Sequence, residues 1–327
     1  MVDVLDRPAI LRLNAIDPVA VAIRDIAVGE PVLGDVRAAE PITKGHKIAV
    51  EPIAAGQPVR KFGQIIGNAT KPIAPGQHVH VHNVEFRPSA ADHTIGSDRR
   101  NVMPLAESEA ATFQGIMRPD GSVATRNYIG VLTTVNCSAT VARLISQQFR
   151  GPDALAAFPN VDGVVSLTHK SGCAAGAEGE AIALLRRTIA GYARHPNFAA
   201  VLIIGLGCEA NQLNRLCEAE GIPVGGRVHP YVIQETGGTN ATVRAGVDKI
   251  KELLADANRV KRQTLPAKYL KLGLQCGGSD GFSGITANPA LGVASDLLVE
   301  NGGTAILSET PEIYGAEHML LRRAVSK

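Results

Sequence analysis

The feature that most constrains the fold is a unit that repeats after residue 114. Short apolar runs, each followed by a loop rich in small polar residues, often with glycine, occur at residues 128–134, 163–167, 201–205, 272–275 and 303–307, and all but the last precede a helical apolar pattern. Strands that alternate with helices in this way are typical of α/β domains with a mostly parallel sheet. Such sheets bind ligands outside the carboxyl ends of their strands, so we expect the functional residues in these loops.

Four of the five cysteines fall in these loops, at or near the head of the next helix: Cys137, Cys173, Cys208 and Cys276. At each position the alternative is a small buried apolar side chain, which is a common role for cysteine. The odd number of cysteines and their placement favour reduced thiols, metal ligands or a cluster over a disulfide framework. Soft thiolates select iron–sulfur clusters, but with no C-x-x-C pair in the chain only the fold could gather these four.

The loop after residue 275 has the highest density of glycine and polar side chains. Glycine lacks Cβ, so Gly277 and Gly278 let backbone N–H groups approach a ligand, while Ser279, Asp280 and Ser283 offer side-chain contacts. We therefore expect these five residues to bind a substrate. The alternative is an ordinary connection between a strand and a helix.

The first part of the chain has a different pattern. Between residues 9 and 86 the apolar segments are short and are separated by closely spaced turn signals with glycine or proline, which predicts a compact all-β barrel or clip. Residues 89–113 lack a sustained apolar period and form a linker by composition. We place an all-β domain at residues 1–88, an α/β domain at 114–262 and a second α/β unit at 263–327.

Histidines are concentrated in this all-β domain. His78, His80 and His82 alternate along an expected strand and should share one face, where a pair such as His80 and His82 could chelate a metal ion. At about 3.3 Å per residue His78 and His82 would be roughly 13 Å apart, too far to bind one ion with His80. The alternative is a solvated histidine face. His46, in a glycine turn, is better suited to reach another domain.

Composition excludes several classes of function. The formal charge is +2, the Lys and Arg residues form no stripe, and Trp is absent, so neither the charge nor the aromatic content favours nucleic acid binding. The longest apolar runs are far short of a membrane span, and the first residues lack the pattern of a signal peptide. We expect a cytoplasmic protein that does not bind membranes.

Four strings of residues together resemble one family. They are 118–137 (RPDGSVATRNYIGVLTTVNC), 168–173 (THKSGC), 205–211 (GLGCEAN) and 275–289 (QCGGSDGFSGITANP). The chain strongly resembles the altronate/galactarate dehydratase family, and its first domain resembles the SAF domain of those enzymes, a β-clip fold. The resemblance covers nearly the whole chain. Family members normally continue past the last residue of this sequence, so we expect the unit at 263–327 to be incomplete relative to the family.

The resemblance implies loss of water from a sugar acid, an aldonate or aldarate such as altronate or galactarate, to give a 2-keto-3-deoxy acid. This chemistry needs a base for the proton on C2, an acid for the hydroxyl that leaves C3, and positive charge for the developing enediolate. His169 and Lys170 could be base and acid, with His46 as a rival and Glu209 as a proton carrier. The side chains that could hold the carboxylate and hydroxyls of the substrate are those of Arg126, Asn127, Ser171, Asn211 and Ser279.

The resemblance also implies iron, either a single Fe(II) or another divalent metal, or a cluster held by Cys137, Cys173, Cys208 and Cys276. We expect a homo-oligomer with a small sugar acid as its substrate. An oxidoreductase is a weaker alternative, because Gly205-Leu206-Gly207 lacks the third glycine of a dinucleotide site. A catalytically silent module that binds sugar acids is the stronger alternative.

Overall fold

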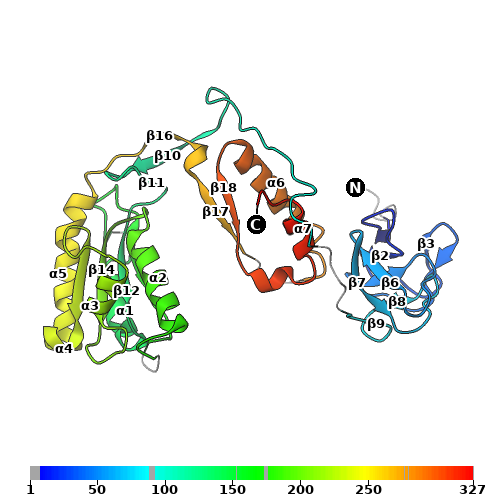
Figure 1. Cartoon of the computed structure of the whole chain (residues 1–327), viewed down its shortest axis with the longest axis horizontal. Helices are drawn as coiled ribbons and strands as arrows, with labels where there is room; N and C mark the ends of the chain where they lie inside the picture. Colours follow the sequence, from blue (N-terminus) through cyan, green and yellow to red (C-terminus); the bar gives the residue numbers. More distant parts are fainter. Residues whose placement is uncertain are drawn as a thin grey trace. The chain divides into compact units, whose positions relative to one another are not determined.

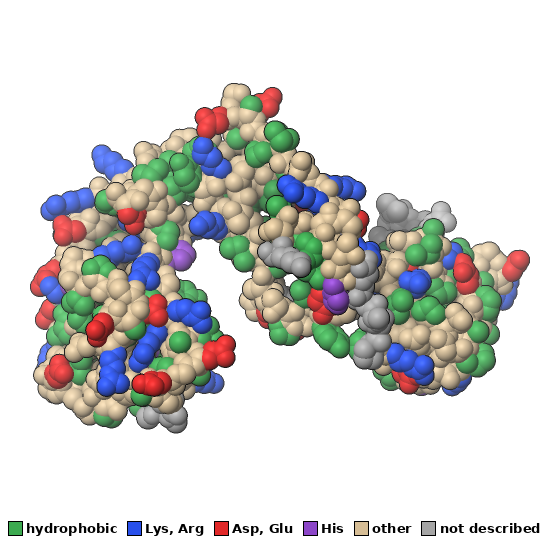
Figure 2. All heavy atoms as spheres, viewed as in Figure 1, with side chains coloured by type: hydrophobic (Ala, Val, Ile, Leu, Met, Phe, Trp, Pro, Cys, Tyr) green, Lys and Arg blue, Asp and Glu red, His purple; other side chains and the backbone are tan. Residues whose placement is uncertain are grey.

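The computed structural model describes residues 8–87, 93–151, 153–172, 176–275, 277–278 and 280–326. The chain divides into two compact units, Met1–Leu105 together with Leu270–Lys327, and Ala106–Tyr269. Figure 1 shows their helices and strands. Acidic and basic side chains are interspersed on the faces seen in Figure 2, as the near-neutral composition predicts. None of the described helices is both long enough and apolar enough to cross a membrane.

The N-terminal domain contains only antiparallel strands among residues 8–87. One sheet has the order β1-β2-β5-β8, a second has the order β6-β7-β9, and β3 and β4 form a separate hairpin. The strands are β1 (Ile10–Leu11), β2 (Val19–Ala22), β3 (Pro31–Leu33), β4 (Val36–Arg37), β5 (Lys47–Ala49), β6 (Pro58–Lys61), β7 (Gln64–Ala69), β8 (His78–Val79) and β9 (Val84–Glu85).

Three similar phrases in the sequence fold in similar ways. Each begins with an isoleucine that is at most 4% exposed and ends three residues later with a glycine whose φ lies between +80° and +88°. Only glycine adopts such a φ without strain, so each phrase turns the chain immediately after anchoring it in the core. The phrases are Ile42–Gly45, Ile53–Gly56 and Ile73–Gly76.

The predicted histidine strand is wrong in its length. β8 ends at Val79, and the chain turns at residues 81–83, so Val79 is buried while Val81 is 82% exposed. The side chain of Asn83 stabilises this turn, because its Oδ1 accepts a hydrogen bond from the His80 N–H at 3.0 Å and its Nδ2 donates to the His78 carbonyl at 2.8 Å. The histidines therefore fold back on one another instead of alternating along a strand.

The second unit contains a four-stranded parallel sheet with the order β13-β12-β14-β15. Its strands are β12 (Tyr128–Thr133), β13 (Gly163–Leu167), β14 (Phe198–Gly205) and β15 (Val228–Val232). The helices of this unit are η2 (Asn136–Ser138), α1 (Ala139–Gln147), α2 (Glu180–Arg194), α3 (Leu213–Ala219), α4 (Ile233–Thr236) and α5 (Thr239–Ala257). These strands and helices occur where the apolar pattern predicts an α/β domain.

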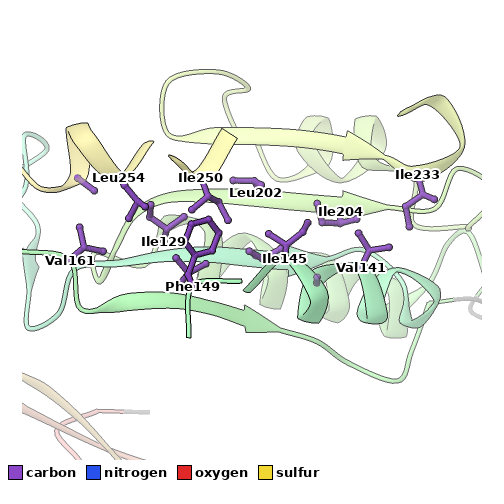
Figure 3. Packing of buried hydrophobic residues seen from close by; sticks show 14 residues of the cluster. Ile129, Val141, Ile145, Phe149, Val161, Leu202, Ile204, Ile233, Ile250 and Leu254 are labelled. Carbon is purple, nitrogen blue, oxygen red and sulfur yellow. The ribbon is translucent and has the colours of Figure 1, made fainter. Parts of the chain in front are cut away.

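Alternate residues of the strands point to two separate cores. Ile129 of β12 and Leu202 of β14 pack with Ile145 of α1 and Ile250 of α5 on one face (Figure 3). The neighbouring residues of the same strands pack with α2 and α3 on the other face. Apolar residues therefore lie on both faces of each strand, and the amphipathic helices of the connections cover both faces of the sheet.

A second sheet in this unit is antiparallel, with the order β11-β10-β16. It consists of β10 (Thr112–Met117), β11 (Val123–Ala124) and β16 (Gln263–Pro266), and η3 (Ala267–Tyr269) follows it. The part of the chain after the N-terminal domain thus contains sheets of both kinds, which the prediction of a mostly parallel sheet did not include. β10 pairs with a strand about 150 residues later, as the register Gln114 to Thr264 shows. Local sequence patterns carry no signal for such pairing.

The C-terminal segment belongs to the first unit and contains two parallel strands, β17 (Lys271–Leu274) and β18 (Thr304–Leu307). Its helices are α6 (Ala287–Glu300), η4 (Thr310–Ile313) and α7 (Glu317–Leu321). No residue of α6 is buried, although the helix is apolar, and Val293 and Leu297 are 59% and 55% exposed. This helix therefore presents an apolar surface to solvent.

Candidate functional site

The order of the parallel sheet places a topological switch point between β12 and β14. The chain leaves β12 into α1, which packs on one face of the sheet, and leaves β14 toward α3, which packs on the other face. Loops that diverge in this way leave an opening at the carboxyl ends of the two strands, which is where ligands bind in doubly wound sheets. The loops after β12 and β14 carry Cys137, Cys208 and Glu209.

Glu209 links these two loops from inside. Its side chain is 5% exposed, and its Oε1 accepts hydrogen bonds from the Thr134 hydroxyl at 2.7 Å and the Leu206 N–H at 3.0 Å. Its Oε2 accepts the Gly207 N–H at 2.6 Å. Burial raises the pKa of Glu209, but these hydrogen bonds outweigh burial and hold the pKa below its usual value. Glu209 is therefore a charged carboxylate that fixes the loops rather than one with free lone pairs directed at solvent.

Asn211 connects the same loops to a helix. It is fully buried, its Nδ2 donates to the Thr134 carbonyl at 3.1 Å, and its Oδ1 accepts from Arg186 Nε of α2 at 3.1 Å. Thr134 thus contacts both Glu209 and Asn211 and is a residue that the sequence interpretation missed. The available signal was its position, since it is a polar residue at the end of a buried strand.

His169 lies in the loop after β13, beside the β12 loop. Its Nε2 is 3.0 Å from the Thr133 carbonyl, and its Nδ1 accepts the Ser171 N–H at 3.2 Å. This pairing requires the neutral tautomer with the proton on Nε2. The β12 loop is tied to the same segment, because the Asn136 N–H donates to the Ser171 carbonyl at 3.0 Å. A small cavity of about 100 Å³ lies next to His169, lined mainly by apolar side chains of β12, β13 and α2.

The loops after β12, β13 and β14 therefore form one hydrogen-bonded edge, which we call the rim. Its exposed side chains are chemically varied: a cation, a hydroxyl and an amide as well as two thiols. They belong to Lys170, Ser171, Asn136, Cys137 and Cys208. The other two cysteines predicted for such loops, Cys173 and Cys276, lie outside the described residues. Cys217, the fifth, is buried in α3, and burial raises the pKa of its thiol.

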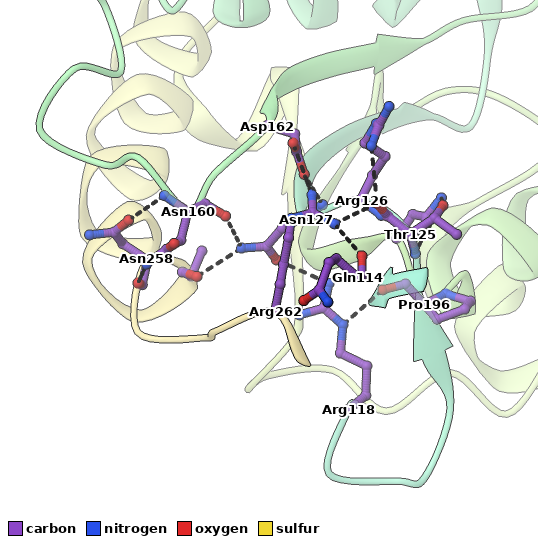
Figure 4. A network of polar contacts seen from close by, with 12 residues as sticks. Gln114, Arg118, Thr125, Arg126, Asn127, Asn160, Asp162, Pro196, Asn258 and Arg262 are labelled. Atoms are coloured by element: carbon purple, nitrogen blue, oxygen red, sulfur yellow. Dashed lines mark hydrogen bonds and ion pairs between the residues drawn. The ribbon is translucent and has the colours of Figure 1, made fainter. Parts of the chain in front are cut away.

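Arg126 and Asn127 lie at the other end of β12, before its first residue, and the structure does not bring them to the rim (Figure 4). Asn127 is fully buried, and its Nδ2 donates to the carbonyls of Asn160 at 2.7 Å and Ala257 at 2.9 Å. Its Oδ1 accepts from Arg118 at 3.0 Å. These bonds hold the start of β12 to the end of α5, so the described role of Asn127 is structural.

The four histidines of the N-terminal domain form a cluster. His46 Nδ1 lies 2.8 Å from His78 Nε2, and the ring centroids of His46, His78 and His80 are 5.0 to 5.4 Å apart in all three pairs. His82 is 5.4 Å from His78. Burial, and then the positive charge of the neighbouring histidines, lowers the pKa of His78. Burial and the charge of Lys47 lower the pKa of His80.

The loop at residues 280–286 contacts the turn that precedes His46, within the same unit. Lys44 Nζ lies 5.1 Å from the centre of the Phe282 ring, and a Cβ on Gly281 would approach the Gly45 carbonyl to 3.2 Å. Asp280 Oδ1 accepts the N–H groups of Phe282 and Ser283, at 2.6 and 2.9 Å, and so shapes the loop. Gly277 and Gly278 are exposed, while Ser279 lies outside the described residues.

A cavity of about 320 Å³ lies at the carboxyl ends of β17 and β18. Its polar lining includes Gln275 and Glu309, whose side chains are 3.3 Å apart. Glu309 has a φ of 58°, an uncommon value for a residue other than glycine. This second opening also lies at the position that a parallel sheet predicts.

No group of three or more His, Cys, Asp or Glu side chains already surrounds a common metal position in the part of the chain that the structure describes. At the rim, Cys137 and Cys208 supply two thiols. A structural or catalytic metal usually has at least three protein ligands, so the described rim residues do not complete a site for iron.

Fold and rim together define a protein with an N-terminal all-β domain and an α/β domain whose functional edge lies at the carboxyl ends of its strands. Family models match in three places: the altronate/galactarate dehydratase SAF domain at residues 8–87, the second domain of D-galactarate dehydratase/altronate hydrolase at 115–258, and the C-terminal domain of D-galactarate/altronate dehydratase at 267–327. The chain belongs to the altronate/galactarate dehydratase family, which confirms the resemblance seen in the sequence.

Individual relatives agree. Altronate dehydratase of Bacillus subtilis (strain 168) is 36% identical over 321 residues, which are 97% of this chain and 63% of the relative. Altronate dehydratase of Escherichia coli (strain K12) is 38% identical over 314 residues, 95% of this chain and 62% of the relative. Galactarate dehydratase (L-threo-forming) of the same strain is 35% identical over 325 residues, which are 97% of this chain and 62% of the relative. The chain therefore spans slightly less than two thirds of the length of these relatives.

Proposed function

We propose that this protein acts in the removal of water from a sugar acid, an aldonate or aldarate, to give a 2-keto-3-deoxy acid. The single observation that carries the proposal is the rim at the switch between β12 and β14, where three loops of a dehydratase-family domain are locked together and present polar side chains. The relatives named for altronate and galactarate support the substrate class. We also infer that the N-terminal domain has the β-clip fold of SAF domains.

The reaction breaks the C2–H and C3–O bonds and forms a C2–C3 double bond. The departing hydroxyl leaves as water after it gains a proton, and the enol then becomes the 2-keto acid. We assign Lys170 as the general acid. Its exposed ammonium group can stabilise the enediolate and protonate the leaving hydroxyl. Ser171 and Asn136 offer hydrogen bonds to the substrate hydroxyls.

We assign His169 as the base, acting through Nδ1. This atom now accepts the Ser171 N–H, so the loop after β13 must release that bond before His169 can take the C2 proton. Glu209 and Asn211 are positioning residues in this scheme, because their polar atoms hold the loops from inside. His46, which belongs to the other compact unit, is a proposed rival of His169 as the base.

A divalent metal such as Fe(II) would supply positive charge to the substrate carboxylate as a Lewis acid. Cys137 and Cys208 are the described rim residues that could bind it, but two thiols are too few to define the site. We therefore assign no step of the reaction to the metal.

The test is incubation of the purified chain with a panel of aldonates and aldarates and added Fe(II), with 2-keto-3-deoxy acid as the measured product. We expect one substrate to react, and we expect Lys170→Met to lower turnover by about 10²-fold or more, the usual contribution of an acid or base. Lys261→Met, at an exposed position of the same unit, is the control and should be unaffected. If the chain binds a sugar acid but forms no product from any member of the panel, this result would contradict the dehydratase proposal and favour a silent binding module.

A further inference from the structure

The histidine cluster of the N-terminal domain is held in place by strand pairing. β5 and β8 are antiparallel, with Ile48 opposite His78, so the turn that carries His46 lies beside the end of β8. The turn after Val79 then brings His80 back toward both rings. All three side chains are half-buried rather than free on the surface. Three imidazoles from two separate segments are thus directed to one place by the backbone.

We propose that His46, His78 and His80 form a binding site for one divalent transition-metal ion. This set of ligands differs from the pair His80 and His82 expected from the sequence. Among the described residues, the ring of His82 contacts the ring of His78 but neither His46 nor His80, whereas the other three rings all contact one another. The site lies entirely in the N-terminal domain, so the proposal does not rest on the proposed dehydratase function.

The spacing of the rings matches this role. With a metal to nitrogen distance of 2.0–2.1 Å, the centre of a bound imidazole lies about 3.2 Å from the ion, and two rings at a tetrahedral angle have centres about 5.2 Å apart. The observed distances are 5.0 Å for His46 and His78, 5.2 Å for His46 and His80, and 5.4 Å for His78 and His80. The centroid distances match this arrangement, but the ring nitrogens do not already face one common point, so binding requires the rings to turn about their side-chain bonds.

The contact between His46 and His78 shows what the ion would replace. Two ring nitrogens 2.8 Å apart share one proton, so at least one of the rings is neutral, as a metal ligand must be. In a tetrahedral site these nitrogens would separate to about 3.4 Å, a change that small rotations of the rings can make. The ion thus takes the place of the shared proton.

One carboxylate and one ammonium group lie near the cluster. The backbone N–H of His78 donates to Glu40 Oε1 at 2.9 Å, which puts a carboxylate near one edge, while Lys47 lies near His80. Imidazole ligands suit Zn²⁺, Cu²⁺, Ni²⁺ and iron rather than Mg²⁺ or Ca²⁺. Three protein ligands leave a fourth position for water or for an oxygen of a small ligand.

The experiment uses the full chain after removal of metals with a chelator. Co²⁺ is titrated in, and binding is followed by calorimetry and by the visible absorption of the bound ion. We expect one ion with nitrogen and oxygen ligands. His46→Asn and His80→Asn should each weaken this binding by more than the roughly 10- to 100-fold that loss of a supporting group causes. The backbone bond from His80 to Asn83 is kept in His80→Asn, and far-UV circular dichroism without metal checks that each variant is folded.

Two controls separate the cluster from other ligands. His82→Asn should bind Co²⁺ as the wild type does, and so should the double variant Cys137→Ser, Cys208→Ser. Absence of Co²⁺ binding in the wild type, or binding of unchanged strength in both His46→Asn and His80→Asn, would overturn the proposal. So would charge-transfer bands between sulfur and cobalt that disappear in the double cysteine variant. None of these results depends on whether the chain dehydrates a sugar acid.

Discussion

Replacement of Glu209 by Gln tests whether this carboxylate holds the rim together. The neutral amide keeps the shape of the side chain but places an NH₂ group where a carboxylate oxygen now accepts an N–H. Hydrogen bonds to a charged group contribute about 1.5–3 kcal/mol each and neutral ones about 1 kcal/mol, so losing one bond and weakening two gives roughly 3–5 kcal/mol. The Thr134 hydroxyl can rotate to compensate, and we therefore expect a loss of about 2–4 kcal/mol in the free energy of unfolding.

The assay is urea denaturation followed by far-UV circular dichroism, because α1, α2, α3 and α5 of the α/β domain supply most of the helical signal. The folded pKa of Glu209 lies below its usual value, so its contribution is complete above the unfolded value of about 4.3 and is lost as the pH falls through the folded pKa. The difference between wild type and Glu209→Gln should therefore be full at neutral pH and shrink below about pH 4. A loss at neutral pH no larger than that of Glu235→Gln, an exposed position, would refute the reasoning.

Further predictions concern the same domain. Gly246→Ala should lower the free energy of unfolding by about 1–3 kcal/mol, because the added Cβ would lie 2.5 Å from Ile145. Gly191→Ala has no atom within 4 Å of the added Cβ and should stabilise α2 by about 0.5–1 kcal/mol. Urea denaturation of both variants measures these changes, and equal effects would contradict the packing of α5 on α1. Asn127→Ala should lose about 2–4 kcal/mol in the same assay, since it removes the three side-chain hydrogen bonds of a buried amide, and a change under about 0.5 kcal/mol would rule out the structural role. Alkylation followed by mass spectrometry should modify exposed Cys208 much faster than buried Cys217, whose raised pKa leaves less thiolate, and the reverse order would contradict their placement.

Several features of the site were visible in the sequence because their signals are local. The apolar runs that end at Thr134, Leu167 and Gly205 predict buried strands, and a strand buried on both faces needs no information from the rest of the chain to be recognised. The same reasoning places the loops after these strands at a common edge. The family resemblance rested on these loops, and the comparisons confirm it.

The use of each polar side chain was decided only by tertiary structure. The sequence indicates Glu209 and Asn211 as site residues. In the fold the carboxylate of Glu209 binds Thr134 and its own loop, and the amide of Asn211 binds Thr134 and Arg186. Asn127 lies at the opposite end of the strand. A sequence gives the chemical type of a side chain and its position along an element, whereas its hydrogen-bond partners come from segments far away in the chain.

The histidines show the same division. The sequence by itself determined that His78, His80 and His82 would be neighbours and that the N-terminal domain would be built of short strands and glycine turns. Only the fold decided that β8 ends at Val79, that the chain turns back, and that His46 of a different segment completes the cluster. The physical reason is that a turn and a pair of strands are set by backbone hydrogen bonds between distant residues, and these bonds leave no periodic signal in either segment alone.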